Sequence, residues 1–331
     1  MADKTGRPSE STLIEQYFAP LSDPDSSFGL TDDAAFLSIP DDRQLVVTKD
    51  MLVADIHFFR DDQASHIAKK ALRVNLSDLA AKAATPLGYM LGLGLPSDWQ
   101  ESWLADFCAG LKADQEEFGF PLIGGDTVKN PERLTLSVTA FGTVAKGRMI
   151  VRPRARVGDD VYVTGTIGDS ALGLLIQKGG LPEGISKADL DWLKDRFLLP
   201  QPRITCAPLL LEVANAAMDI SDGLVGDAAK MARAANVCVE ITETAIPLSL
   251  AARNVLAKDQ NLFERVLFGG DDYELLFTAD PGQRPAIAHE AESLGVPVTR
   301  IGRIIEGAGV TCINADGGIT PLAKKASFEH F

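Results

Sequence analysis

The chain has 331 residues, of which 46% are apolar and 24% charged, so it is long enough to bury the cores of two domains. Lys and Arg total 32 against 46 Asp and Glu, which gives a formal charge of -14. This acidic balance excludes a general nucleic-acid binder, because such proteins present a basic face to phosphate. The net negative charge repels phosphate, so a phosphate ligand needs local cations, helix N-termini or metal ions at its binding site.

Nothing in the sequence predicts a membrane span or a disulfide framework. The most apolar run, at 89–96, has the length of a strand, and residues 1–10 are polar with no apolar signal core. The four cysteines are far apart and form no Cys-x-x-Cys pair, which predicts reduced thiols. We therefore expect a cytoplasmic protein with no membrane partner and no nucleic-acid partner.

The first half of the chain alternates amphipathic helices with short apolar strands. Apolar spacing predicts helices at 12–18, 65–84 and 103–118. Gly119 is the stop signal of the third helix. Apolar and β-branched runs predict strands at 34–39, 44–48, 86–95, 121–123 and 134–144.

Composition shifts in the arginine-rich stretch 146–160, where we place a domain boundary between 1–150 and 151–331. Beyond it, apolar spacing predicts helices at 170–177, 189–197, 204–215 and 223–235. Strand-like runs are at 160–164, 237–241, 274–278 and 298–304. This order of elements favours two α/β or α+β domains.

Five acidic motifs carry the candidate chemistry: TDDAA at 31–35, TKD at 48–50, NLSDL at 75–79, GGDT at 124–127 and MDISDG at 218–223. Asp50, Asp126 and Asp219 follow apolar runs, so we expect them at strand ends, where α/β proteins bind ligands. Asp78 lies inside a predicted helix on the same face as Asn75, and we expect it to be partly buried. Each motif alone also suits a turn or a helix cap. Together they predict ligands of Mg²⁺, which prefers carboxylate and phosphate oxygens.

Two glycine loops and several single residues suit either a functional or a structural role. TGTIGDS at 164–170 could hold an anion on bare amides, but an ordinary strand–turn–helix link is the favoured interpretation. GGDDYEL at 269–275 could face an acceptor or form a tight turn. His57 could contact a flat ligand, and one of the arginines at 148–156 could contact a phosphate. The chain has no Walker A loop and no protein-kinase catalytic loop.

As a set, these motifs resemble those of the thiamine-monophosphate kinase family, in the superfamily that includes aminoimidazole ribonucleotide synthetase and selenophosphate synthetase. The resemblance extends from about residue 30 to residue 331, with NLSDLAA, GGDT, TGTIGDSA and DISDGL in the family's order. It implies a two-domain aminoimidazole ribonucleotide synthetase-like fold. The N-terminal domain would bind metal and ATP and pair with a second copy in a homodimer. It further implies ATP as donor, several Mg²⁺ ions, thiamine monophosphate as acceptor, and direct transfer without a catalytic side chain.

Carried over by motif, the resemblance assigns roles to residues of this chain. The implied Mg²⁺ ligands are Asp32, Thr48, Lys49, Asp50, Asp78, Asp126, Asp219 and Asp222. The implied ATP contacts are Gly125, Asp126, Arg152 and Ser221. The implied contacts with thiamine monophosphate are His57, Asp271 and Phe328.

Three positions depart from the family pattern. Thr31 stands where glycine usually precedes Asp32, and Asp271 replaces a glutamate, which shortens the acceptor contact. Lys49 stands where a hydroxyl residue is common, so only its backbone carbonyl could ligate a metal. Two alternatives stay open: another synthetase or kinase of the superfamily, and a nucleotide-sensing dimer without turnover. A selenophosphate synthetase would carry a reactive cysteine near the N-terminus, whereas the first cysteine here is Cys108.

Overall fold

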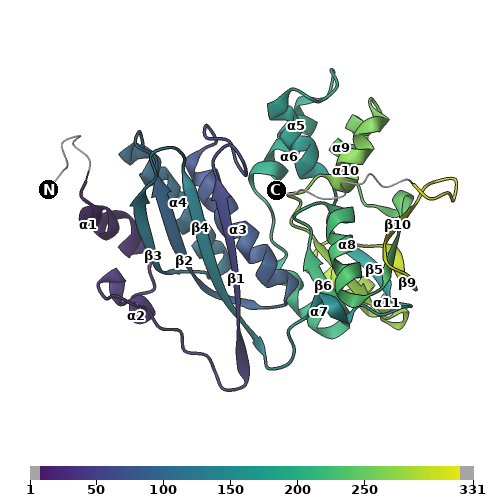
Figure 1. Cartoon of the computed structure of the whole chain (residues 1–331), viewed down its shortest axis with the longest axis horizontal. Helices are drawn as coiled ribbons and strands as arrows, with labels where there is room; N and C mark the ends of the chain where they lie inside the picture. The colour runs from purple at the N-terminus through teal and green to yellow at the C-terminus, as the bar shows by residue number, and fades with distance from the viewer. Residues whose placement is uncertain (1–7, 321–331) are drawn as a thin grey trace. The chain divides into compact units, whose positions relative to one another are not determined.

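The computed structural model describes residues 8–320, which form two compact units (Figure 1). The N-terminal unit comprises 8–79 and 84–147, and the C-terminal unit comprises 80–83 and 148–320. The four cysteines are buried and free of disulfides, as the sequence predicts. Within 8–320, none of the helices combines the length and the hydropathy of a membrane span.

The N-terminal unit is built on a four-stranded sheet in the order β1 (Arg43–Val53), β4 (Thr135–Ala145), β2 (Thr85–Leu95) and β3 (Leu122–Lys129). β4 runs antiparallel to β1 and β2, whereas β2 and β3 are parallel. The long helices α3 (Ala64–Ala81) and α4 (Glu101–Phe118) lie across one face of this sheet (Figure 1). The short helices α1 (Glu10–Leu13) and α2 (Pro24–Ser27) lie on the β3 side. The strand order makes β1 and β3 the two edges of the sheet.

The helix-covered face of this sheet is apolar. The helical repeat of α3 and the alternation of the strands both place apolar side chains between the helices and the sheet. In α3, Leu72 and Leu79 are fully buried, as the predicted apolar face requires. In β4, the alternate residues Leu136 and Val138 are fully buried. Helix α4 ends where Gly119 adopts a left-handed φ of 61°, which confirms the predicted stop.

Among the described residues of the N-terminal unit, none forms a helix over the opposite face of its sheet (Figure 1). Alternate residues of β1 on this face, Leu45, Val47 and Met51, are 42–55% exposed. Val47 pairs with Phe141 of β4, and Met90 of β2 adds a further exposed apolar side chain. The unit therefore presents an apolar sheet face, which we call the open face.

The C-terminal unit is built on a six-stranded mixed sheet in the order β10 (Gly309–Ile313), β7 (Cys238–Thr242), β9 (Val298–Ile305), β5 (Asp160–Thr164), β8 (Leu275–Ala279) and β6 (Ala214–Asp219). β10 and β7 are parallel, and the other neighbours are antiparallel. Its helices are α5 (Asp169–Lys178), α6 (Lys187–Leu198), α7 (Ala207–Val213), α8 (Leu224–Ala235), α9 (Leu250–Leu256), α10 (Phe263–Phe268) and α11 (Arg284–Leu294). Val161 and Val163 join one buried cluster and Tyr162 the other, so both faces of the sheet are buried.

Most predicted elements are present, but one predicted strand is absent and several predicted boundaries are wrong. The segment 34–39 is not a strand, because it joins neither sheet of the described chain; Phe36 N instead donates to Ser26 O. β3 does not end before its glycines but continues to Lys129, because β2 supplies ladder partners throughout. The predicted helix at 204–215 ends at Val213, and Ala214 begins β6. Elements α2, α9, α10, α11 and β10 have no counterpart among the predicted ones.

Candidate functional site

One group of predicted residues lies on the helix-covered face of the N-terminal sheet. Thr48 of β1 donates a hydrogen bond from Oγ1 to the carboxylate of Asp78 in α3, which is half-buried as predicted. Asp50 is two residues further along β1, so it shares this face, and it lies inside the strand and not at the predicted end. Asn75 of α3 is fully buried, and its Oδ1 has no hydrogen-bond partner among the described residues. This face therefore presents hydroxyl, carboxylate and amide oxygens, which are donors that suit Mg²⁺.

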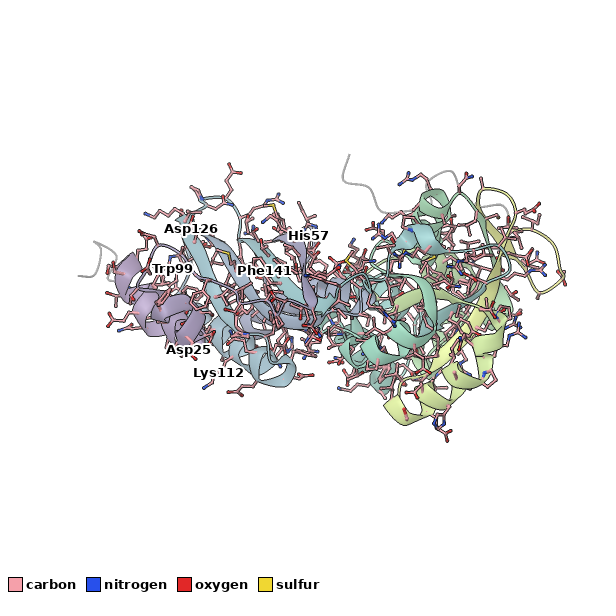
Figure 2. The ribbon with its side chains drawn as sticks, turned by 90° about the horizontal axis from the view of Figure 1, so that it is seen from below. Asp25, His57, Trp99, Lys112, Asp126 and Phe141 are labelled. Carbon is pink, nitrogen blue, oxygen red and sulfur yellow. The ribbon has the colours of Figure 1, made fainter. Side chains whose placement is uncertain are left out.

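Asp126 lies inside edge strand β3, contrary to the prediction that it follows a strand. It pairs with Gly92 of β2, which pairs with Ser137 of β4. Lys49 of β1 donates from Nζ to the Oγ of Ser137. Directly paired residues share a face, so Asp126 and Lys49 belong to the open face. Figure 2 shows Asp126 on the side of the unit opposite Lys112 of helix α4.

A cavity of about 320 Å³ lies along β3 and holds several of the predicted metal and ATP residues. Its lining includes Asp32, Asp33, Gly125 and Asp126. Asp32 is exposed, and its Oδ1 accepts a hydrogen bond from the amide of Asp33 at 2.7 Å. Gly125 has no room for a side chain, because a Cβ would lie 2.2 Å from the carbonyl oxygen of Leu91. The structure therefore brings Asp32, Gly125 and Asp126 to one cavity.

The predicted metal ligands do not form a single cluster. Asp50 and Asp126 lie on opposite faces of the N-terminal sheet. Across residues 8–320, no group of three or more His, Cys, Asp or Glu side chains is placed to hold a metal ion. Mg²⁺ commonly takes one or two protein carboxylates and completes its shell with water and phosphate oxygens. Asp32 and Asp126 at the cavity fit that pattern, and the individual metal assignments stay predictions.

In the C-terminal unit, two loops that are far apart in the sequence are hydrogen-bonded to each other. Asp219 ends β6, as predicted, and the following loop carries Ser221 and Asp222. Asp271 lies in the loop before β8, and its amide donates to the carbonyl oxygen of Ser221 at 2.9 Å. The approach is so close that a Cβ at Gly270 would lie 2.0 Å from the same oxygen. The structure thus brings implied metal, ATP and acceptor residues side by side.

Asp222 is held by a lysine that the sequence patterns did not identify. Lys230 of α8 contacts the Asp222 carboxylate and donates to Asp227 Oδ1 at 2.7 Å. Burial raises the pKa of Asp227, although Lys230 counteracts this rise. Burial by itself would lower the pKa of Lys230, but the charges of Asp227 and Asp222 outweigh it and raise that pKa. The available sequence signal was the i, i+3 spacing of Asp227 and Lys230 on a predicted helix.

The glycine loop at 164–170 has its amides occupied from within the chain. Asp272, which is 6% exposed, accepts hydrogen bonds from Gly168 N at 2.9 Å and from Ser170 N at 3.4 Å. Burial raises the pKa of Asp272, and these amide contacts counteract the rise. A carboxylate of the protein therefore takes the donors that an anion would need, which supports the interpretation of this loop as a structural link.

The same loop system is anchored by Glu274, another buried acid that the sequence patterns did not single out. Its carboxylate accepts two hydrogen bonds from Arg203, at 2.6 and 2.5 Å, and one from Thr164 at 2.7 Å. The Glu274 side chain is 1% exposed, and Arg196 approaches it at 3.4 Å. This buried ion pair fixes the start of β8, directly after the loop that carries Asp271.

The three remaining predicted residues have different settings. His57 follows β1, and its Nδ1 accepts a hydrogen bond from the amide of Val53 at 3.0 Å. Arg152 is half-buried and begins a short 3-10 helix, Arg152–Arg154. Phe328 lies outside the described residues. The roles of these three residues stay predictions.

Two family models match the chain. One is described as AIR synthase related protein, N-terminal domain, and covers residues 31–144. The other is described as AIR synthase related protein, C-terminal domain, and covers residues 156–313. The two matches, together with the two α/β units, define the class of AIR synthase related proteins and confirm the predicted two-domain fold.

Individual relatives narrow this class. The thiamine-monophosphate kinase of Escherichia coli strain K12 is 40% identical over 324 residues, which are 97% of this chain and 98% of that protein. That of Caulobacter vibrioides is 38% identical over 318 residues, 95% of this chain and 89% of that protein. The crystal structure of thiamine-monophosphate kinase from Stenotrophomonas maltophilia K279a is 43% identical, with a TM-score of 0.82 and coverage of 91% and 94% of the two chains. The structure of AaThiL complexed with AMPPCP and TMP is 33% identical, with a TM-score of 0.77 and coverage of 92% and 97%. The chain belongs to the thiamine-monophosphate kinase family.

Proposed function

We propose that this protein transfers the terminal phosphoryl group of ATP to thiamine monophosphate, which forms thiamine diphosphate and ADP in the cytoplasm. The relative AaThiL was solved as a complex with AMPPCP and TMP, an ATP analogue and the acceptor. The observation that carries the proposal is the cavity of the N-terminal unit, where Asp32, Gly125 and Asp126 meet. Gly125 and Asp126 stand in the GGDT motif through which the chain resembles the family, and Asp32 is one of the metal ligands that the resemblance implies.

The side chains of this protein serve to bind and position, because phosphoryl transfer depends mainly on alignment and charge neutralisation. Mg²⁺ held by carboxylates of this kind would neutralise phosphate charge and orient the reacting groups. Glycine at position 125 lets β3 lie close against β2 beside the cavity, and the exposed carboxylates of Asp32 and Asp126 provide oxygen donors. In the C-terminal unit, the bond between Asp271 N and Ser221 O fixes the implied acceptor residue against the implied ATP residue. Direct transfer needs no nucleophile from the chain.

The open face supports the proposal that the protein is a homodimer. Leu45, Val47, Met51 and Met90 are 42–55% exposed on this face, and large exposed apolar patches are typical of interaction sites. A second copy would bury the same surface on both partners. Light scattering on the full chain tests this point, and a mass of 35.4 kDa, that of one chain, would contradict it.

The activity itself is tested by incubating the full chain with ATP, Mg²⁺ and thiamine monophosphate and separating the products by chromatography. Thiamine diphosphate and ADP are expected in equal amounts, and unphosphorylated thiamine, the control acceptor, is expected to give neither. Because transfer is direct, radiolabelled ATP without acceptor should leave the protein unlabelled. Binding of ATP without any product would favour the nucleotide-sensing dimer instead.

A further inference from the structure

Lys230 and Asp227 lie beside the implied metal ligand Asp222 but have no part in the proposed chemistry. The Nζ of Lys230 contacts the carboxylate of Asp222 and lies 2.7 Å from Asp227 Oδ1. Asp227 is fully buried, whereas the side chains of Lys230 and Asp222 are 29% and 32% exposed. One ammonium group therefore bridges two carboxylates, one buried and one accessible to solvent.

Asp227 also fixes the backbone that carries Asp222. Its Oδ2 accepts the amides of Ser221 at 2.9 Å and of Asp222 at 2.8 Å. Both carboxylate oxygens of Asp227 are thus occupied, one by the loop and one by Lys230. The loop, the Asp222 side chain and Lys230 form one hydrogen-bonded network, and Asp227 attaches this network to helix α8.

We propose that Lys230 is an internal cation that a divalent metal must displace from Asp222, so that this lysine sets the metal concentration at which the loop is occupied. The inference rests on the proposed function and on the prediction that Asp222 ligates one of its metal ions. A carboxylate in contact with an ammonium group offers less negative charge to a metal, and the charge of Lys230 also repels an approaching cation. Once displaced from Asp222, Lys230 stays nearby because it keeps its bond to the buried Asp227. Lys230 is therefore a positioning residue that opposes metal binding.

A purely structural role for Lys230 leads to the opposite expectation. If the lysine only held the Asp222 side chain in place, its removal would loosen the loop and weaken metal binding. If it competes with the metal, its removal leaves Asp222 and Asp227 without a counter-ion and strengthens metal binding. The sign of the change in metal affinity therefore separates the two roles.

The experiment measures binding of Mn²⁺ to the full chain in the presence of a non-hydrolysable ATP analogue, by the electron paramagnetic resonance signal of free Mn²⁺. Lys230→Met is expected to lower the half-saturating Mn²⁺ concentration by about tenfold, because one positive charge leaves the site. Lys230→Arg keeps the charge and should stay close to the unaltered protein. The matched control is Lys187→Met, which breaks an exposed lysine–aspartate pair of α6 with Asp191 and should change nothing.

Three outcomes would overturn a part of this reasoning. An unchanged or higher half-saturating concentration in folded Lys230→Met refutes the competition, and so does a Lys230→Arg variant that behaves like Lys230→Met. If the unaltered protein binds no Mn²⁺ with the analogue, the proposed metal site itself is wrong. Thermal melting establishes that each variant is folded, and Lys230→Gln replaces Lys230→Met if the latter does not fold.

Discussion

Substitution of Gly270 by alanine tests whether the two hydrogen-bonded loops of the C-terminal unit act together. The new Cβ would lie 2.0 Å from the carbonyl oxygen of Ser221 and 3.2 Å from the Cα of Asp222, whereas real Cβ contacts stay beyond 3.0 Å. The loops must therefore separate by about 1 Å, which breaks the 2.9 Å bond from Asp271 N to Ser221 O. A misplacement of this size can cost about 100-fold in rate, or about 2.7 kcal/mol of transition-state stabilisation. The lost hydrogen bond should lower the free energy of unfolding by only about 1 kcal/mol.

The assay is steady-state formation of thiamine diphosphate at saturating ATP and Mg²⁺, with thermal melting alongside. The matched control is Gly180→Ala in the same unit, where the new Cβ meets the side chain of Leu175 and comes nearest to its flexible end, at 3.2 Å. We expect kcat/KM of Gly270→Ala to fall by about two orders of magnitude while the control keeps its activity. A Gly270→Ala protein that melts normally and turns over at the rate of the control would show that the contact between the loops is irrelevant to the reaction.

Three further predictions concern single groups. Asp219→Asn should reduce turnover by about 100-fold or more with the fold intact, and a near-normal rate in this variant would remove Asp219 from the metal site. EDTA should stop turnover by the unaltered protein until Mg²⁺ is restored. Glu274→Gln should lower the free energy of unfolding by about 3–5 kcal/mol, because Arg196 and Arg203 lose their buried counter-ion. Denaturant titration measures this loss, and an unchanged free energy of unfolding would show that the ion pair is dispensable. Hydrogen bonds from Arg284 hold the pKa of Asp160 below 3.8, so this pair stabilises the fold above pH 4 and ceases to do so as the pH falls. The stability gap between the unaltered protein and Arg284→Met should therefore shrink as the pH drops below about 4, and a constant gap would contradict this.

Features that depend on local sequence could be predicted. Helix α4 has an apolar stripe and a glycine stop, and both are readable without knowledge of any partner, so its end at Gly119 was correct. Asp219 also lies at a strand end as expected, because β6 is short and the DISDG turn follows it. Glu274 could not be predicted to form a buried ion pair, because its partner Arg203 is distant in sequence. Asp227 is bound to loop amides as well as to Lys230, and its i, i+3 spacing from Lys230 is a weaker signal than the glycine stop of α4.

Features set by pairing between strands could not be predicted. TKD and GGDT look alike in the sequence, since an acid follows an apolar run in each, and both were placed at strand ends. The structure continues both strands, because ladder partners in β4 and β2 extend past the acids. The face on which an acid lies then depends on the pairing register of its strand. A slip of one residue in that register moves every side chain of the strand to the other face of the sheet. Asp50 and Asp126 consequently lie on opposite faces, which no single-strand pattern reveals.

This separation leads to a test of how the carboxylates cooperate. Asp50 and Asp126 lie on the two edge strands, β1 and β3, which are three strand spacings or about 14 Å apart, and on opposite faces. One metal ion cannot bind both from the same N-terminal unit, so a site that uses both takes them from two copies. Mixing Asp50→Asn chains with Asp126→Asn chains, each inactive alone, should then restore about a quarter of the sites, because each mixed dimer carries one intact pair. If each copy uses its own two residues for separate ions, every site in the mixture keeps a defect and no activity returns.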